Sequence, residues 1–64
     1  MERYSLTVTP KSRKNVKFTI WDNETGEQED EKIYDMSSIN IKNTVEYWNE
    51  RCKSLNDEYE NRIR

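Results

Sequence analysis

The sequence predicts an α+β fold, in which an antiparallel β-hairpin packs on one long C-terminal amphipathic helix. Two patterns carry this prediction: apolar and polar residues alternate in the first third of the chain, and apolar residues recur at four- and three-residue spacing in the last third. The 64 residues are expected to form a single small domain. A domain of this size buries only about 60% of the surface that its unfolded chain exposes, so we expect a homodimer to add burial.

The hairpin is predicted over residues 3–22. Its two strands carry Tyr4, Leu6 and Val8, then Val16, Phe18 and Ile20, each set alternating with polar residues or Trp21. Residues 10–15 contain a proline and no apolar residue, which is typical of a loop between antiparallel strands. A basic cluster lies at and just after this loop: Lys11, Arg13, Lys14 and Lys17.

An acidic loop is expected over residues 23–31. The preceding Asp22-Asn23-Glu24-Thr25-Gly26 segment holds residues that favour turns, and its glycine is the only one in the chain. Residues 32–36 could return as a short third strand that buries Ile33 or Tyr34, or could remain a loop. Both alternatives stay open at this point.

The helix is predicted over residues 38–63, where no proline or glycine interrupts the chain after position 38. Ser37, Ser38 or Asn40 could cap its start. One face carries an apolar seam: Ile41, Val45, Trp48, Cys52, Leu55 and Tyr59. The seam runs roughly 27 Å at about 1.5 Å per residue, longer than a short hairpin covers, so it predicts a core contact and, in part, self-association with a second chain.

The net charge of −2 conceals a strong polarity along the chain. Residues 1–21 sum to +4, residues 22–35 to −6, and the remainder to zero. A basic end and an acidic end are therefore expected.

Enzymatic function is not expected from these residues. The chain has no histidine, and its single cysteine lies on the helix seam, where it is expected to be a small buried hydrophobic residue. No cofactor or metal is expected either: in a calcium loop counted from Asp22, glycine falls at the fifth position instead of the sixth, and Ile33 takes the place of the final glutamate. Without an apolar run long enough for a signal peptide or membrane span, the expected location is the cytoplasm, with no membrane contact.

The Asp22–Gly26 turn, the Tyr34-Asp35 pair and the helix with Val45 and Asn49 resemble a loose group of small uncharacterised prokaryotic and phage proteins. That group has a D-N-x-T-G hairpin turn followed by a C-terminal helix of the coiled-coil type. The resemblance implies the fold and a tendency to self-associate. The acidic insertion at residues 27–31 departs from the group's pattern.

The expected function is that of a non-enzymatic protein-interaction module, an inhibitor or adaptor of the type that phages and mobile elements encode. Its expected contacts with a protein partner are two aromatic anchors and four acidic residues: Trp21, Tyr47, Glu27, Glu29, Asp30 and Glu31. The alternative is a small dimeric nucleic-acid-binding regulator that contacts phosphates through Lys11, Arg13, Lys14 and Lys17.

Overall fold

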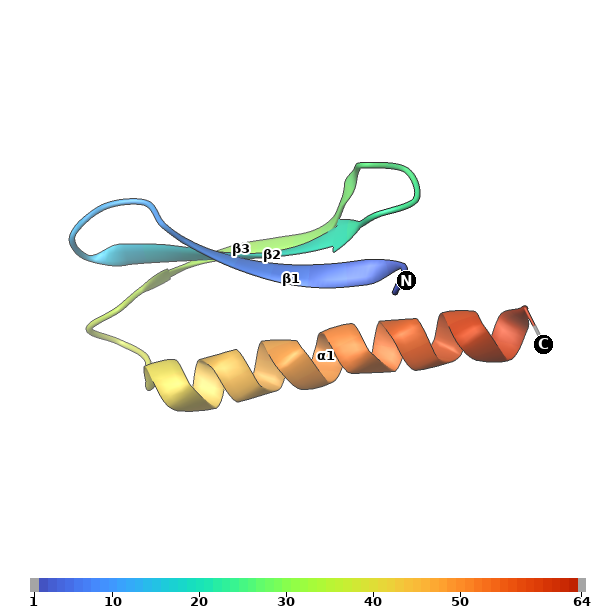
Figure 1. The fold of residues 1–64 in the computed structure, drawn as a ribbon. Coiled ribbons are helices and arrows are strands. Elements are labelled where there is room, and N and C mark those ends of the chain that lie inside the picture. The colour runs from blue at the N-terminus through green and yellow to red at the C-terminus, as the bar shows by residue number, and fades with distance from the viewer. Residues whose placement is uncertain (1, 64) are drawn as a thin grey trace.

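The computed structural model describes residues 2–63 and confirms the predicted α+β fold. Strands β1 (Tyr4–Pro10), β2 (Asn15–Asp22) and β3 (Gln28–Asp35) form one antiparallel sheet in the order β1-β2-β3. Helix α1 (Ile41–Arg62) runs along one face of this sheet, and its last turns extend beyond the sheet (Figure 1). The molecule therefore has two layers, and the second face of the sheet is uncovered.

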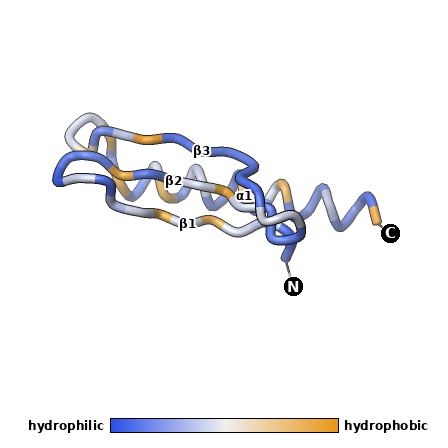
Figure 2. Tube along the Cα trace, turned by 90° about the horizontal axis from the view of Figure 1, so that it is seen from above, coloured by the Kyte–Doolittle hydropathy of each residue, from blue (hydrophilic) through white to orange (hydrophobic). Residues whose placement is uncertain are grey.

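The central strand β2 supplies most of the core, because it is paired on both sides (Figure 2). Val16, Phe18 and Ile20 point toward α1 and are buried. The Phe18 ring stacks on Trp48 with 5.8 Å between ring centroids and meets Tyr34 edge to face at 5.5 Å. The Trp48 indole N–H donates to the Tyr34 hydroxyl at 3.0 Å, so the polar atoms of both buried aromatic residues are satisfied.

The acidic segment is a strand over part of its length, which corrects the prediction of a loop over residues 23–31. β3 begins at Gln28 and pairs with β2 through to Asp35, with a β-bulge opposite Ile20 and Trp21. Tyr34 faces α1, whereas Ile33 is 51% exposed on the other face. Pairing with β2 satisfies the backbone of this polar segment, so little apolar periodicity is needed to hold it in the sheet.

The Asp22–Gly26 turn is built around one carboxylate. Asp22 accepts hydrogen bonds from the backbone N–H groups of Glu24 at 3.0 Å and Thr25 at 3.3 Å, and Gly26 takes a φ of 78°. The Arg3 guanidinium donates to the same carboxylate, with Nη2 2.9 Å from Oδ2. The motif that carries the family resemblance thus has a structural role in this protein.

Asp22 makes stability depend on pH. The hydrogen bond from Arg3 lowers the pKa of this carboxyl below its ordinary value of 3.8; burial opposes the lowering, and the N–H groups of Glu24 and Thr25 reinforce it. Its stabilising contribution is therefore present above the unfolded-state pKa and is lost as the pH falls through the folded-state pKa. We expect the urea midpoint of unfolding to decrease as the pH is lowered below about 4, and to decrease less steeply in Asp22→Asn. A wild-type slope retained in that variant would contradict the assignment.

The helix begins later than predicted. Asn40 is the N-cap, and its side-chain oxygen accepts the N–H of Asn43 at 3.2 Å. Ser37 and Ser38 instead donate their hydroxyls to Asp35, to its carboxylate and its backbone oxygen respectively. These serines close a turn after β3, which explains why the helix starts at Ile41 and not at residue 38.

Candidate functional site

Cys52, the only thiol, is buried beneath the sheet. Burial raises the pKa of its thiol, and the nearby charge of Glu2 raises it further. Its surroundings therefore favour the neutral thiol, which is the less nucleophilic form. Within residues 2–63, no three His, Cys, Asp or Glu side chains are arranged to hold a metal ion, and no helix has the length and apolar character to cross a membrane.

The helix seam is covered by the chain's own sheet. Trp48 and Cys52 are buried, Val45 and Leu55 pack against the core, and Tyr59 is half-buried. Only Ile41, at the start of the helix, stays 40% exposed. An eight-residue strand spans roughly 26 Å, so the sheet is long enough to cover most of the seam. The expected contact between this seam and a second chain therefore has little apolar surface left to use.

Trp21 lies on the uncovered face of the sheet, as its place in the alternation of β2 predicts. We call this surface the open sheet face; its residues are Ser5, Thr7, Thr9, Lys17, Thr19, Trp21, Glu31 and Ile33, of which Thr19 is only 2% exposed. The Trp21 indole N–H donates to the Thr7 hydroxyl at 2.8 Å across the strands. An ion pair joins Lys17 and Glu31 at 3.6 Å. Trp21 is thus half-buried and fixed by a hydrogen bond on a face that no other helix or strand of residues 2–63 covers.

Tyr47, the second expected anchor, lies in the other layer of the molecule. Its side chain is 57% exposed on α1, and its ring meets Trp48 edge to face at 6.2 Å. With Tyr34 and Ile39 it lines a shallow recess of about 350 Å³ beside the start of the helix. Because Trp21 faces away from α1, Trp21 and Tyr47 do not form one contact surface.

The acidic residues are also divided between surfaces. Asp30 faces the helix and pairs with Arg51 at 2.9 Å, and Glu29 lines a recess with Leu55 on the same side. Glu31 lies on the open sheet face, whereas Glu27 lies at the end of the preceding turn. The predicted acidic patch is therefore not a single surface, because side chains alternate between faces along a strand and a bulge reverses one of them.

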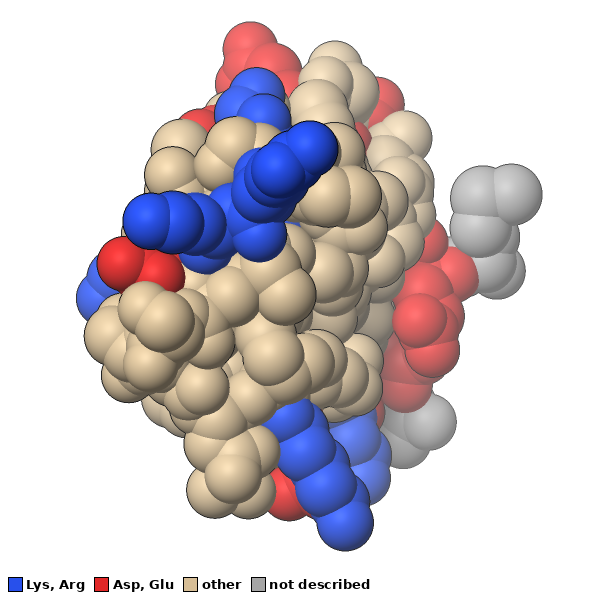
Figure 3. Space-filling model, turned by 90° about the vertical axis from the view of Figure 1, so that its left-hand side faces the viewer, with Lys and Arg blue, Asp and Glu red and all other residues tan. Residues whose placement is uncertain are grey.

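The basic cluster lies at the end of the molecule opposite the Asp22–Gly26 turn. Lys11, Arg13 and Lys14 are exposed in the β1–β2 loop, and Lys and Arg side chains stand out on this end in Figure 3. None of the ion pairs found among residues 2–63 involves these three, whereas Lys17 is paired on the open sheet face. The acidic segment is not gathered at the opposite end, because β3 runs back along the sheet and brings Asp35 opposite Asn15, next to the basic loop.

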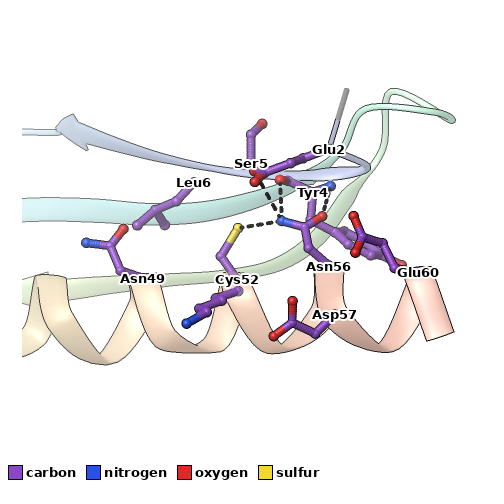
Figure 4. A pocket seen from close by; sticks show the side chains of 10 residues that line it. Glu2, Tyr4, Ser5, Leu6, Asn49, Cys52, Asn56, Asp57 and Glu60 are labelled. Atoms are coloured by element: carbon purple, nitrogen blue, oxygen red, sulfur yellow. Dashed lines mark hydrogen bonds between the residues drawn. The ribbon is translucent and has the colours of Figure 1, made fainter.

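A groove of about 460 Å³ runs between β1 and α1. At its floor, Asn56 binds the backbone of Tyr4 twice: the Tyr4 N–H donates to Oδ1 at 2.8 Å, and Nδ2 donates to the Tyr4 carbonyl at 3.1 Å (Figure 4). Asn56 thus takes the place that a paired strand would occupy. Sequence reasoning missed this residue, whose only signal was an amide beside the apolar seam.

The rest of the β1 edge is open. At the two ends of β1, the Lys11 N–H donates to the Asn15 carbonyl and the Asn23 N–H donates to the Arg3 carbonyl. Both β1-side partners have odd numbers, so the backbone groups of the odd-numbered residues of β1 bond to β2. The antiparallel alternation then directs the N–H and C=O groups of the even-numbered residues outward. At Tyr4 these groups are taken by Asn56, but within the described residues those of Leu6 and Val8 have no partner. These four backbone groups are the open β1 edge.

Comparison of the chain with models of known protein families, with curated proteins and with solved structures finds no match.

Proposed function

We propose that the protein is a non-enzymatic interaction module that binds a protein partner through the open sheet face. The observation that supports this most directly is Trp21, which a hydrogen bond to Thr7 holds on an uncovered surface. A tryptophan already held in place loses little freedom on binding, and tryptophans at the centre of interfaces contribute disproportionately to affinity.

The surroundings of Trp21 favour a partner with mixed apolar and basic chemistry. Thr7 lies beside the indole, and Thr9 and the exposed Ile33 extend a neutral surface farther along the same face. Glu31 and Asp35 add negative charge along β3. We propose a partner that presents an apolar pocket with nearby Lys or Arg side chains, bound in the cytoplasm. Blocking such a partner or bridging it to another protein requires no catalysis. We therefore propose an inhibitor or adaptor of phage or mobile-element type.

Trp21→Ala tests this proposal. Tagged wild-type protein, Trp21→Ala and Tyr47→Ala are each used to capture proteins from a lysate of the native host after nuclease treatment. We expect a defined protein to be retained by wild type and Tyr47→Ala, and its affinity for Trp21→Ala to fall by about 30-fold or more, because interface tryptophans often cost 2 kcal/mol or more on truncation. Tyr47→Ala is the matched control, since it removes an exposed aromatic residue from the other layer. Equal retention by all three would contradict the proposal.

A second candidate function is nucleic-acid binding by the β1–β2 loop. Lys11, Arg13 and Lys14 support it, because they are exposed at the end remote from the acidic turn. Changing all three to alanine should then abolish nucleic-acid binding, and wild-type binding should weaken steeply as salt is raised. Under the leading proposal, the triple change leaves capture of the protein partner intact.

A further inference from the structure

We infer that two copies of the chain join through the open β1 edge to form one six-stranded antiparallel sheet. The inference rests on the proposed function in one respect: such a dimer would place two open sheet faces, each with its Trp21, side by side as one surface. Its occupant is a second copy of this chain, and its test needs no other partner.

The open β1 edge is short and bounded at both ends. Asn56 occupies the backbone of Tyr4 at one end. At the other end, Pro10 has no N–H to offer. Leu6 and Val8 between them present two N–H and two C=O groups, and no residue of β1 carries a charge that would oppose strand pairing.

This set of groups is self-complementary. If two β1 strands run antiparallel with the two-fold axis at Thr7, Leu6 of each copy faces Val8 of the other. Each facing pair exchanges two hydrogen bonds, so four bonds would satisfy all eight groups. Moving the axis to Val8 would set Leu6 against Pro10 and leave the Leu6 carbonyl unpaired. Moving it to Leu6 would set Val8 against Tyr4, whose groups Asn56 already holds.

The other edge of the sheet is protected against such pairing. The backbone N–H of Asp22 donates to the Glu27 carbonyl, and that of Met36 donates to the Lys14 carbonyl. The even-numbered residues of β3 therefore bond to β2 in its paired region, and the backbone N–H and C=O groups of the odd-numbered residues point outward. The Glu31 N–H among them is already bonded to the Asp30 carboxylate at 2.8 Å. Charged side chains crowd β3, and charge on an edge strand discourages association. The two edges therefore differ, and β1 is the one left available.

Charge complementarity favours a second copy as the occupant. Antiparallel pairing about Thr7 brings the β1–β2 loop of one copy, with Lys11 and Arg13, toward the far end of the groove of the other. Three carboxylates line that part of the groove, those of Glu2, Asp57 and Glu60, and Lys53 lines the groove as well. The register also sets Lys11 opposite Arg3, whose guanidinium is already paired with Asp22 and Glu24. The same contact occurs twice because of the symmetry.

The dimer would also bury apolar surface that the single chain exposes. Val8 is 45% exposed although its side chain lies on the helix side of the sheet. A two-fold axis perpendicular to the sheet at Thr7 sets each Val8 side chain beside Leu6 of the other copy and keeps both helices on one side. The open sheet faces then lie together on the other side.

Sedimentation equilibrium of the full chain over a range of concentrations tests the inference. We expect wild type to reach the mass of two chains, and Val8→Pro to weaken dimerisation by about 30-fold, because each dimer loses two N–H donors. Ile33→Pro is the matched control: it removes an outward-facing N–H from β3 and should leave the dimer intact. Circular dichroism checks that both variants fold.

A charge-swap pair keeps the test decisive if Val8→Pro does not fold. Arg13→Glu should weaken the dimer, and adding Glu60→Lys to the same chain should restore it. A wild type that is monomeric at every concentration would overturn the inference. A dimer that dissociates in Ile33→Pro, but persists in Val8→Pro and in Arg13→Glu, would overturn it as well. A monomer that still captures a partner through Trp21 would overturn the inference and leave the proposed function standing. A dimer that captures no partner through Trp21 would leave the inference standing and overturn the proposed function.

Discussion

Phe18→Ala is expected to leave most of the protein unfolded at 25 °C. Phe18 is fully buried on the central strand and contacts both Trp48 and Tyr34 through its ring. Truncation of a buried phenylalanine costs about 3–5 kcal/mol, because transfer energy is lost and a cavity remains. A core in a domain of this size rarely supplies more than 3–5 kcal/mol in total. The loss should therefore equal or exceed the free energy of unfolding, so the unfolded state becomes the more populated one.

Urea titration followed by circular dichroism would measure this effect. Phe18→Leu keeps most of the volume and should retain a cooperative transition at a lower midpoint. Ile33→Ala removes an exposed apolar side chain from the neighbouring strand and should change the free energy of unfolding by less than about 0.5 kcal/mol. If Phe18→Ala unfolded at the wild-type midpoint, the core described above would be wrong.

Asn56→Ala is expected to produce the second largest loss of stability, about 2–3 kcal/mol. The change removes both hydrogen bonds that the side-chain amide makes to the backbone of Tyr4. Each costs about 1 kcal/mol net when lost, and the Tyr4 groups that remain in the groove are only partly reached by water. Because these bonds join α1 to the start of β1, the loss should also loosen the first strand.

Asn49→Ala provides the matched control. Asn49 lies two helical turns earlier on the same side of α1 and lines the same groove, but it is exposed. Its loss should stay within about 0.5 kcal/mol in the same urea titration. Hydrogen exchange at the Tyr4 amide gives a local readout: protection should fall in Asn56→Ala and stay unchanged in Asn49→Ala. Equal protection in both variants would show that Asn56 does not hold the strand.

Asn56 also decides how much of β1 is available for pairing. By occupying the groups of Tyr4, it confines the open β1 edge to Leu6 and Val8. Asn56→Ala would lengthen that edge by one further outward-facing residue. A side-chain amide that binds the backbone of an edge strand can thus control register as well as stability.

The sequence by itself determined the local elements. The alternation of Val16, Phe18 and Ile20 with polar residues identified β2 and placed Trp21 on the opposite face. The four- and three-residue spacing identified α1 and its buried side, including Cys52. The basic cluster was located at the β1–β2 loop. These inferences succeed because side-chain period is a property of each element alone.

The tertiary structure decided which element covers which surface. Pairing with β2 drew residues 28–31 into β3, and the bulge then sent Glu29 and Asp30 toward the helix while Glu31 faced away. The sheet proved long enough to cover the seam that had suggested a second chain. Asn56 gained its role only because α1 carries it beside Tyr4, 52 residues away in sequence. Such contacts join distant segments, and no local period records them, so only the folded arrangement could reveal the open β1 edge.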